Sequence, residues 1–202
     1  MKTICVTGRS AASDAEYDRL LAGFRVSAPD YFEVRDKEAT DRRLLDLLRR
    51  AVGELGGARV LANGRFDLAL AAGAGGVVLP EDGLPVEPVR RETPRGFRVG
   101  KSTHSSEDAL RAANEGADLV LLGPLFDTPA KRGFGAPLSP AAVEAIADGW
   151  PSSAELFVIG GVDLARLDEL APIRGRIAGF AAIRAFEEAA DPGAVVAEAR
   201  AR

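Results

Sequence analysis

The sequence predicts an α/β protein built as a single-domain (β/α)8 TIM barrel over residues 1–202. Two observations lead to this fold class. Eight short strand-like runs alternate with helical patterns along the whole chain, and unusual polar residues gather directly after those runs. A doubly wound sheet needs fewer strands and would leave two of these units unexplained. No linker or shift in composition divides the chain, so we expect one domain.

Strands are predicted where short β-rich runs occur. They cover Thr3–Thr7, Tyr31–Arg35, Arg59–Ala62, Gly76–Leu79, Phe97–Gly100, Leu119–Leu122, Leu156–Ile159 and Ile177–Ala181. Helices are predicted between the strands from apolar residues at helical spacing. They cover Ala15–Phe24, Asp41–Leu55, Arg65–Ala72, Glu107–Glu115, Pro140–Asp148, Leu164–Leu170 and Phe186–Arg200, with a short, proline-bearing segment at Pro85–Glu92 as the weakest of the helices.

The helix predicted over Asp41–Leu55 shows the amphipathic pattern best. Its leucines recur on one face, while its arginines take the other face. Thr40 is a good N-cap, and Gly56 begins a glycine pair that stops the helix. This helix should therefore pack its leucine face against the sheet.

The composition excludes several functional classes. The chain is 47% hydrophobic and 28% charged, as expected of a globular protein, and its net charge of -4 offers no basic surface for nucleic acid or an anionic membrane. Cys5 is the only cysteine, so no internal disulfide forms. No stretch has the length of a membrane span, and the apolar run at Met1–Thr7 is too short for a signal peptide. We therefore expect a cytoplasmic protein without nucleic-acid or membrane partners.

His104, the only histidine, lies where a strand pattern gives way to a helix pattern. Parallel α/β proteins place their chemistry at such junctions, and imidazole carries protons well near neutral pH. Ser105 reads as the N-cap of the following helix. The alternative is a loop histidine that caps the helix or bonds the backbone.

Two groups of residues point to anions. Gly160 and Gly161 follow the seventh predicted strand and, with the loop Ala182–Arg184 after the eighth strand, match the usual phosphate site of a barrel. Within that loop, Ile183 and Arg184 offer backbone amides. Cations after other strands could surround a second anionic group or could simply be solvated, and they are Arg35, Lys37, Arg65 and Lys131.

At these positions the chain resembles the thiamine-phosphate synthase/TenI family of small barrels over nearly its whole length. The motifs stand in order at barrel spacing: Glu33–Lys37 (EVRDK), Asn63–Leu70 (NGRFDLAL), Gly100–Ser105 (GKSTHS), Gly123–Lys131 (GPLFDTPAK) and Ile159–Gly161 (IGG). The family patterns are Gln-x-Arg-x-Lys, Asn-Asp-Arg, Gly-x-Ser-x-His-Ser, Gly-Pro-x-Phe-x-Thr-x-x-Lys and Ile-Gly-Gly. The resemblance implies a TIM barrel and a small phosphorylated thiazole or pyrimidine ligand.

The departures from the family pattern bear on the reaction. The resemblance implies that family synthases hold Mg²⁺ with two aspartates, and glycines occupy both positions here, Gly64 and Gly83. Carboxylate oxygens are the ligands that Mg²⁺ needs, so no metal ligand is expected unless Asp82 or Asp127 replaces one of the aspartates. Glu33, which the resemblance includes among the substrate-binding residues, stands where the family has glutamine, and Arg184 stands where it usually has serine.

The resemblance therefore favours the TenI branch, whose enzymes tautomerise the thiazole phosphate carboxylate, an isomerase reaction without metal or other cofactor. In this hypothesis His104 moves the proton, while Gly160, Gly161 and the amides after the eighth strand hold the phosphate. Ser102, Asn63, Thr128 and Lys131 line the ring and carboxylate. One alternative is a divergent thiamine-phosphate synthase that uses Mg²⁺; another is a non-catalytic phosphate-ligand-binding or regulatory member. A homodimer is compatible with each.

Overall fold

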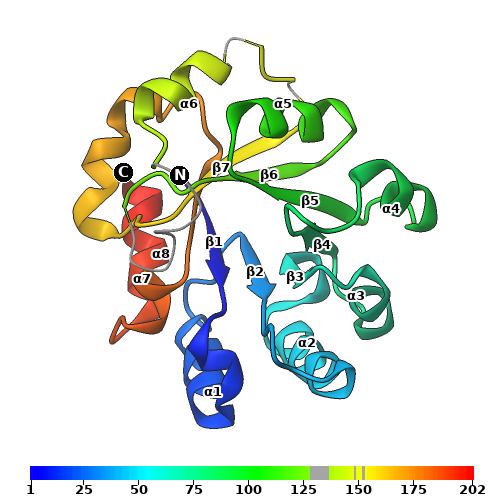
Figure 1. Cartoon of the computed structure of the whole chain (residues 1–202). Helices are drawn as coiled ribbons and strands as arrows, with labels where there is room; N and C mark the ends of the chain where they lie inside the picture. The colour runs from blue at the N-terminus through cyan, green and yellow to red at the C-terminus, as the bar shows by residue number, and fades with distance from the viewer. Residues whose placement is uncertain (128–136, 148, 152) are drawn as a thin grey trace.

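Eight parallel strands close into a barrel in the computed structural model, which describes residues 1–127, 137–147, 149–151 and 153–202 (Figure 1). The strands pair in chain order, and β8 returns to pair with β1. Their bounds are β1 Lys2–Val6, β2 Tyr31–Val34, β3 Val60–Asn63, β4 Gly76–Leu79, β5 Arg98–Thr103, β6 Leu119–Leu122, β7 Glu155–Ile159 and β8 Gly179–Ala182. The predicted TIM-barrel fold is confirmed.

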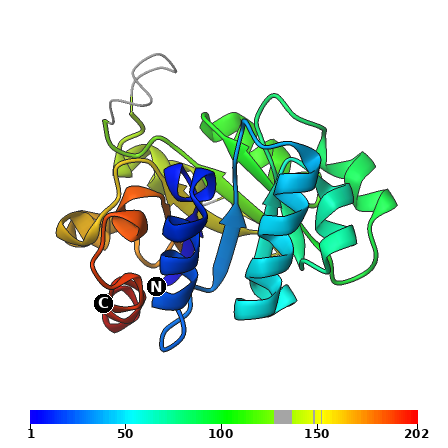
Figure 2. The same cartoon turned by 90° about the horizontal axis from the view of Figure 1, so that it is seen from below.

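Helices surround the barrel wall on its outside (Figures 1 and 2). The α-helices are α1 Asp14–Gly23, α2 Asp41–Leu55, α3 Phe66–Ala72, α4 Val86–Glu92, α5 Ser106–Asn114, α6 Pro140–Ala147, α7 Arg184–Glu187 and α8 Pro192–Ala201. Short 3-10 segments are η1 Arg9–Ala12, η2 Gly57–Arg59 and η4 Leu164–Ile173. Thr40 caps α2 as predicted, since its side chain accepts from the Arg43 amide.

The core has two compartments, because successive residues of a strand face opposite sides of the wall. On β2, Tyr31 belongs to the cluster inside the barrel, whereas Phe32 and Val34 belong to the larger cluster between wall and helices. Glu33 therefore faces the barrel interior. By the same alternation Asn63 of β3 faces inward.

The amino-terminal end of the barrel is filled by polar contacts. The Lys2 ammonium pairs with the Glu155 carboxylate, and the Tyr31 hydroxyl donates to the same carboxylate at 3.2 Å. The Arg98 guanidinium lies over the Tyr31 ring, 5.2 Å from its centroid. Ligand chemistry is thereby left to the opposite end, where the carboxyl ends of the strands meet.

Most predicted boundaries shift by one or two residues, and three elements differ more, each for a local reason. β5 continues past Gly100 to Thr103, because these polar residues stay in register with β6. The helix predicted over Phe186–Arg200 is two helices, since Asp191 caps a new start at Pro192. The segment after β7 is a 3-10 helix that contains Pro172, which cannot donate a backbone hydrogen bond.

Barrel closure supplies the first prediction. Gly179 of β8 lies opposite Lys2 of β1, and a Cβ added there would overlap the Lys2 carbonyl oxygen. We expect Gly179→Ala to lower the free energy of unfolding by about 1–3 kcal/mol, because the wall must shift to admit a methyl group. Urea unfolding measures the loss. The control is Gly175→Ala, where nothing lies within 4 Å of the added Cβ, and an equal loss there would contradict the steric argument.

Candidate functional site

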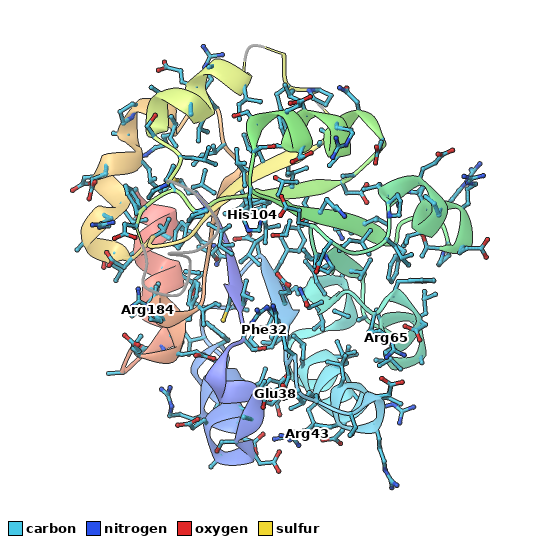
Figure 3. All side chains as sticks on the ribbon, in the orientation of Figure 1. Phe32, Glu38, Arg43, Arg65, His104 and Arg184 are labelled. Carbon is cyan, nitrogen blue, oxygen red and sulfur yellow. The ribbon has the colours of Figure 1, made fainter. Side chains whose placement is uncertain are left out.

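His104 follows β5 directly and lies at the centre of the barrel mouth (Figure 3). The helix behind it begins as predicted, because the Ser105 hydroxyl accepts from the Asp108 amide at 3.1 Å. The His104 side chain is 18% exposed, so it is largely enclosed and still reachable from the mouth. Ser105 therefore takes the capping role that was the alternative explanation for the histidine.

Glu81, in the loop after β4, fixes the imidazole of His104. The distance between His104 Nδ1 and Glu81 Oε2 is 2.6 Å, and the His104 amide donates to Glu81 Oε1 at 3.2 Å. A carboxylate partner at Nδ1 favours the tautomer with hydrogen on Nδ1, which leaves the proton-accepting lone pair on Nε2. No motif in the sequence assigns Glu81 a role. The one signal in the sequence is that Glu81 is an acid directly after β4, the neighbour of the strand β5 that precedes His104.

Lys101 holds the loop that carries Glu81. Its ammonium donates to the carbonyl oxygens of Pro80 at 2.8 Å and of Glu81 and Leu84 at 3.2 Å each. Burial lowers the pKa of Lys101 from its usual value, and the neighbouring acids oppose this only in part. A side chain of β5 thus sets the backbone that places the histidine's partner.

Glu33 and Asn63 meet on the inner face of the wall. Asn63 Nδ2 donates to Glu33 Oε1 at 2.7 Å. The residue Glu33 is 2% exposed, and this burial raises the pKa of its carboxyl from 4.5 to about 7, against the smaller opposing effects of Asn63 and the Arg35 charge. Ser102 lies three residues after Val99 on β5. Because Val99 faces the outer cluster and side chains alternate along a strand, Ser102 faces the barrel interior, as Glu33 and Asn63 do.

The cations predicted to surround a second anionic group do not form one site among the described residues. Arg65 lies at the start of α3 in the outer ring of helices (Figure 3), where its Nη2 donates to Asp67 at 2.7 Å and its guanidinium also pairs with Asp41. These partners raise its pKa further and occupy its donors. Arg35 is half-buried and Lys37 is exposed beside it after β2. Thr128 and Lys131 lie outside the described residues.

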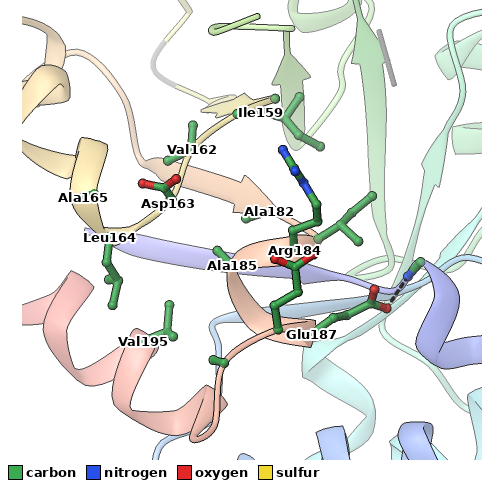
Figure 4. A pocket seen from close by; sticks show the side chains of 16 residues that line it. Ile159, Val162, Asp163, Leu164, Ala165, Ala182, Arg184, Ala185, Glu187 and Val195 are labelled. Atoms are coloured by element: carbon green, nitrogen blue, oxygen red, sulfur yellow. Dashed lines mark hydrogen bonds between the residues drawn. The ribbon is translucent and has the colours of Figure 1, made fainter. Parts of the chain in front are cut away.

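A cavity of about 830 Å³ opens between the loops after β7 and β8, where the phosphate site was predicted (Figure 4). Gly160 has φ +96 and Gly161 has φ +72, and a Cβ on Gly160 would lie 2.8 Å from the Pro124 Cα atom. Only glycine suits that backbone and that contact. The wall also includes the predicted residues Ala182, Ile183 and Arg184. The structure thus brings all five predicted phosphate residues to one cavity.

The charges around this cavity are mixed. Arg184 is exposed at its edge and makes no ion pair with a described residue. Asp163, Glu187 and Glu188 also line it. Glu187 Oε1 accepts from the Gly8 amide at 2.7 Å (Figure 4), and Asp163 accepts from the Arg166 amide at 3.1 Å. An anion here would therefore depend on Arg184 and backbone amides.

The residues present do not fit a magnesium site of two aspartates. Gly64 and Gly83 occupy the positions at which the resemblance places the two aspartates. A Cβ at Gly83 would lie 2.9 Å from the Pro80 ring. Asp82 is exposed beside them as a single carboxylate. In the described part of the chain, no three His, Cys, Asp or Glu side chains converge as metal ligands.

The described helices include none that combines the length and apolar character needed to cross a membrane.

Comparison with known proteins indicates the same family as the motifs do. A family model described as thiamine monophosphate synthase matches residues 3–186. A protein of Geobacter sulfurreducens, provisionally named a thiamine-phosphate synthase, is 32% identical over 189 residues, which are 93% of this chain and 87% of that protein. The thiamine-phosphate synthase of Anaeromyxobacter dehalogenans is 40% identical over 172 residues, 84% of this chain and 75% of that protein.

Among solved structures, a thiamine phosphate pyrophosphorylase from Pyrococcus furiosus superposes with a TM-score of 0.75 at 25% identity, covering 99% of this chain and 94% of that one. Some relatives are longer, and the chain spans about half, 48%, of the thiamine-phosphate synthase of Gloeobacter violaceus.

Glu33 supplies the second prediction. Between pH 4.5 and about 7 the folded protein keeps a proton on Glu33 that the unfolded chain has lost, so this group's contribution to stability falls as pH rises. Glutamine has no charge to bury. We expect Glu33→Gln to match the wild type in free energy of unfolding near pH 4 and to exceed it by roughly 3 kcal/mol at pH 8.

Urea unfolding at both pH values measures this difference. The control is Glu38→Gln, at an exposed glutamate five positions later in the loop after β2 (Figure 3), which should show no such change with pH. A constant difference between wild type and Glu33→Gln across the range would mean that Glu33 is ionised at no cost in the folded state.

Proposed function

Because the chain belongs to the thiamine monophosphate synthase family, we propose that it acts on a phosphorylated thiazole of thiamine biosynthesis, and that its reaction is tautomerisation of the thiazole phosphate carboxylate. The observation that carries this proposal is the His104–Glu81 pair in the barrel mouth, with 2.6 Å between Nδ1 and Oε2. A histidine oriented by a carboxylate is equipped to take up and return a proton.

The reaction needs little more than that pair. A proton leaves the ring carbon, the electron pair of that C–H bond moves into the ring, and the exocyclic alkene carbon takes up a proton, so that the ring becomes aromatic. Nε2 of His104 would accept the first proton, and the imidazolium formed would be stabilised by the Glu81 carboxylate beside it. Proton transfer of this kind requires no metal and no second substrate.

The phosphate would be held at the cavity between the β7 and β8 loops. Gly160 and Gly161 let the backbone approach an anion closely, and Arg184 adds a positive charge at the edge. Ser102, Asn63 and Glu33 then face the ring from the inner wall. Binding on one side of the mouth and proton transfer on the other would orient the ring toward His104.

The second candidate is thiamine-phosphate synthesis, in which a pyrimidine pyrophosphate joins the thiazole phosphate and pyrophosphate leaves. The names of the relatives favour this transferase reaction at least as well as tautomerisation. Against it stand the glycines at positions 64 and 83, which cannot ligate the metal that such a leaving group uses. The geometry of the described residues therefore supports the isomerase better.

The third prediction concerns the histidine pair. We expect His104→Gln to lower the tautomerisation rate by roughly 10²–10⁴-fold, because it removes the proton carrier and leaves the phosphate anchor intact. Glu81→Gln should lower kcat less and shift its pH profile, since the imidazolium loses its counter-charge. Steady-state kinetics on the thiazole phosphate carboxylate, with thermal unfolding of each variant, measures both effects. Full activity in His104→Gln would remove the histidine from the mechanism.

The fourth prediction separates the two reactions. We expect the affinity for the pyrimidine pyrophosphate to change less than about 3-fold when Mg²⁺ is added, because one exposed carboxylate binds the ion weakly. Calorimetry with and without the metal measures this. A gain of 100-fold, together with formation of thiamine phosphate, would establish the transferase. Ligand binding with neither product would make the chain a non-catalytic member of the family.

A further inference from the structure

Glu33 is a buried carboxyl group on the inner face of the barrel wall. It faces the barrel interior from the next-to-last residue of β2, two residues beyond Tyr31 of the inner cluster. Oε1 accepts from Asn63 Nδ2 at 2.7 Å. Oε2 accepts from none of the described residues, although Glu33 is only 2% exposed. With Oε1 held by Asn63, only Oε2 is left to contact a ligand.

Few charges oppose its neutral form. The groups that favour its ionised form are Arg35, directly after the end of β2, and the Asn63 amide on β3. On β1, the Cys5 thiol of the outer cluster also feels the charge of Glu33. Arg35 favours the ionised carboxylate, but the cost of burial outweighs it and places the pKa near 7. A pKa of about 7 places the change in protonation of Glu33 near neutral pH, on the inner face of the barrel wall.

The charge of the expected ligand decides which form would bind. A phosphorylated thiazole is an anion, and its carboxylate adds a second negative charge. An ionised Glu33 would repel such a ligand across a poorly solvated site, where like charges are costly. A neutral Glu33 would instead donate a hydrogen bond from Oε2, while Asn63 keeps Oε1 in place.

We propose that Glu33 is a specificity-determining residue that binds in its neutral form and donates a hydrogen bond to a carboxylate oxygen or ring nitrogen of an anionic phosphorylated heterocycle, so that ligand binding takes up a proton from solvent. This rests on the proposed function, because it takes the phosphorylated thiazole as the ligand. It goes beyond that function by stating which ligands the site prefers: those that present hydrogen-bond acceptor atoms, and not amino groups, to Glu33 on β2.

The test compares the wild type with Glu33→Gln. Glutamine keeps an oxygen for Asn63 and offers Nε2–H where the neutral acid offers O–H, so it imitates the protonated form at every pH. We expect equal affinities for the thiazole phosphate carboxylate at pH 6. Above pH 7 the wild type should weaken by about 10-fold per pH unit relative to the variant, reaching about 100-fold at pH 9. The ligand's own ionisation and that of His104 affect both proteins and cancel in the ratio.

A second measurement uses the wild type alone. Calorimetry at pH 8 in two buffers with different heats of ionisation should show uptake of nearly one proton per ligand bound, and Glu38→Gln should behave like the wild type. If the ratio of the wild-type affinity to the Glu33→Gln affinity stays constant with pH, and no proton is taken up, the role of Glu33 is overturned. The proposed function would still stand. Tighter wild-type binding at high pH would assign Glu33 to a donor group of the ligand and also overturn the proposal. If neither protein binds the thiazole, the proposed function falls, and this proposal falls with it.

Discussion

The parallel pairing of β8 with β1 closes the sheet, and the closure determines which residues can act together. Side chains alternate between the inside and the outside of the wall, so a strand contributes to the mouth only from its last inward position and the loop that follows. Glu33, Asn63 and Ser102 hold such inward positions, and His104 begins the next loop. Residues from strands that are far apart in the chain are thus brought to one opening.

Around that opening, polar groups are organised by neighbouring strands in pairs. Lys101 of β5 fixes the carbonyl groups of the β4 loop, and that loop presents Glu81 to His104 at the end of β5. Asn63 of β3 holds the carboxyl of Glu33 on β2 in the same manner. The two ionisable groups proposed to handle protons are therefore each oriented by an adjacent strand rather than by their own, and orientation by a rigid wall costs little on ligand binding.

Local sequence patterns were sufficient for the barrel, because strands and helices recur with clear periods and caps. They were insufficient for boundaries such as the end of β5, where polar residues remain in the ladder with β6. They also placed His104 and the Gly160–Gly161 turn correctly relative to the strands. Glu81 was missed since its contact joins two loops, and the pairing of Arg65 with Asp41 depends on how α2 lies beside α3. Burial of Glu33 was equally invisible, since an inward position follows only from the register of the closed wall.

The glycines at positions 64 and 83 differ in how readily each could become acidic. Gly64 has φ +73 with its nearest neighbour 3.5 Å from an added Cβ, a conformation that aspartate adopts more easily than most residues. At Gly83 the added Cβ would meet the Pro80 ring at 2.9 Å, so the loop after β4 would have to move first. That loop also carries Glu81. Introducing an aspartate at position 83 would therefore disturb the loop that presents Glu81 to His104, so a change at this position would not be independent of the histidine's partner.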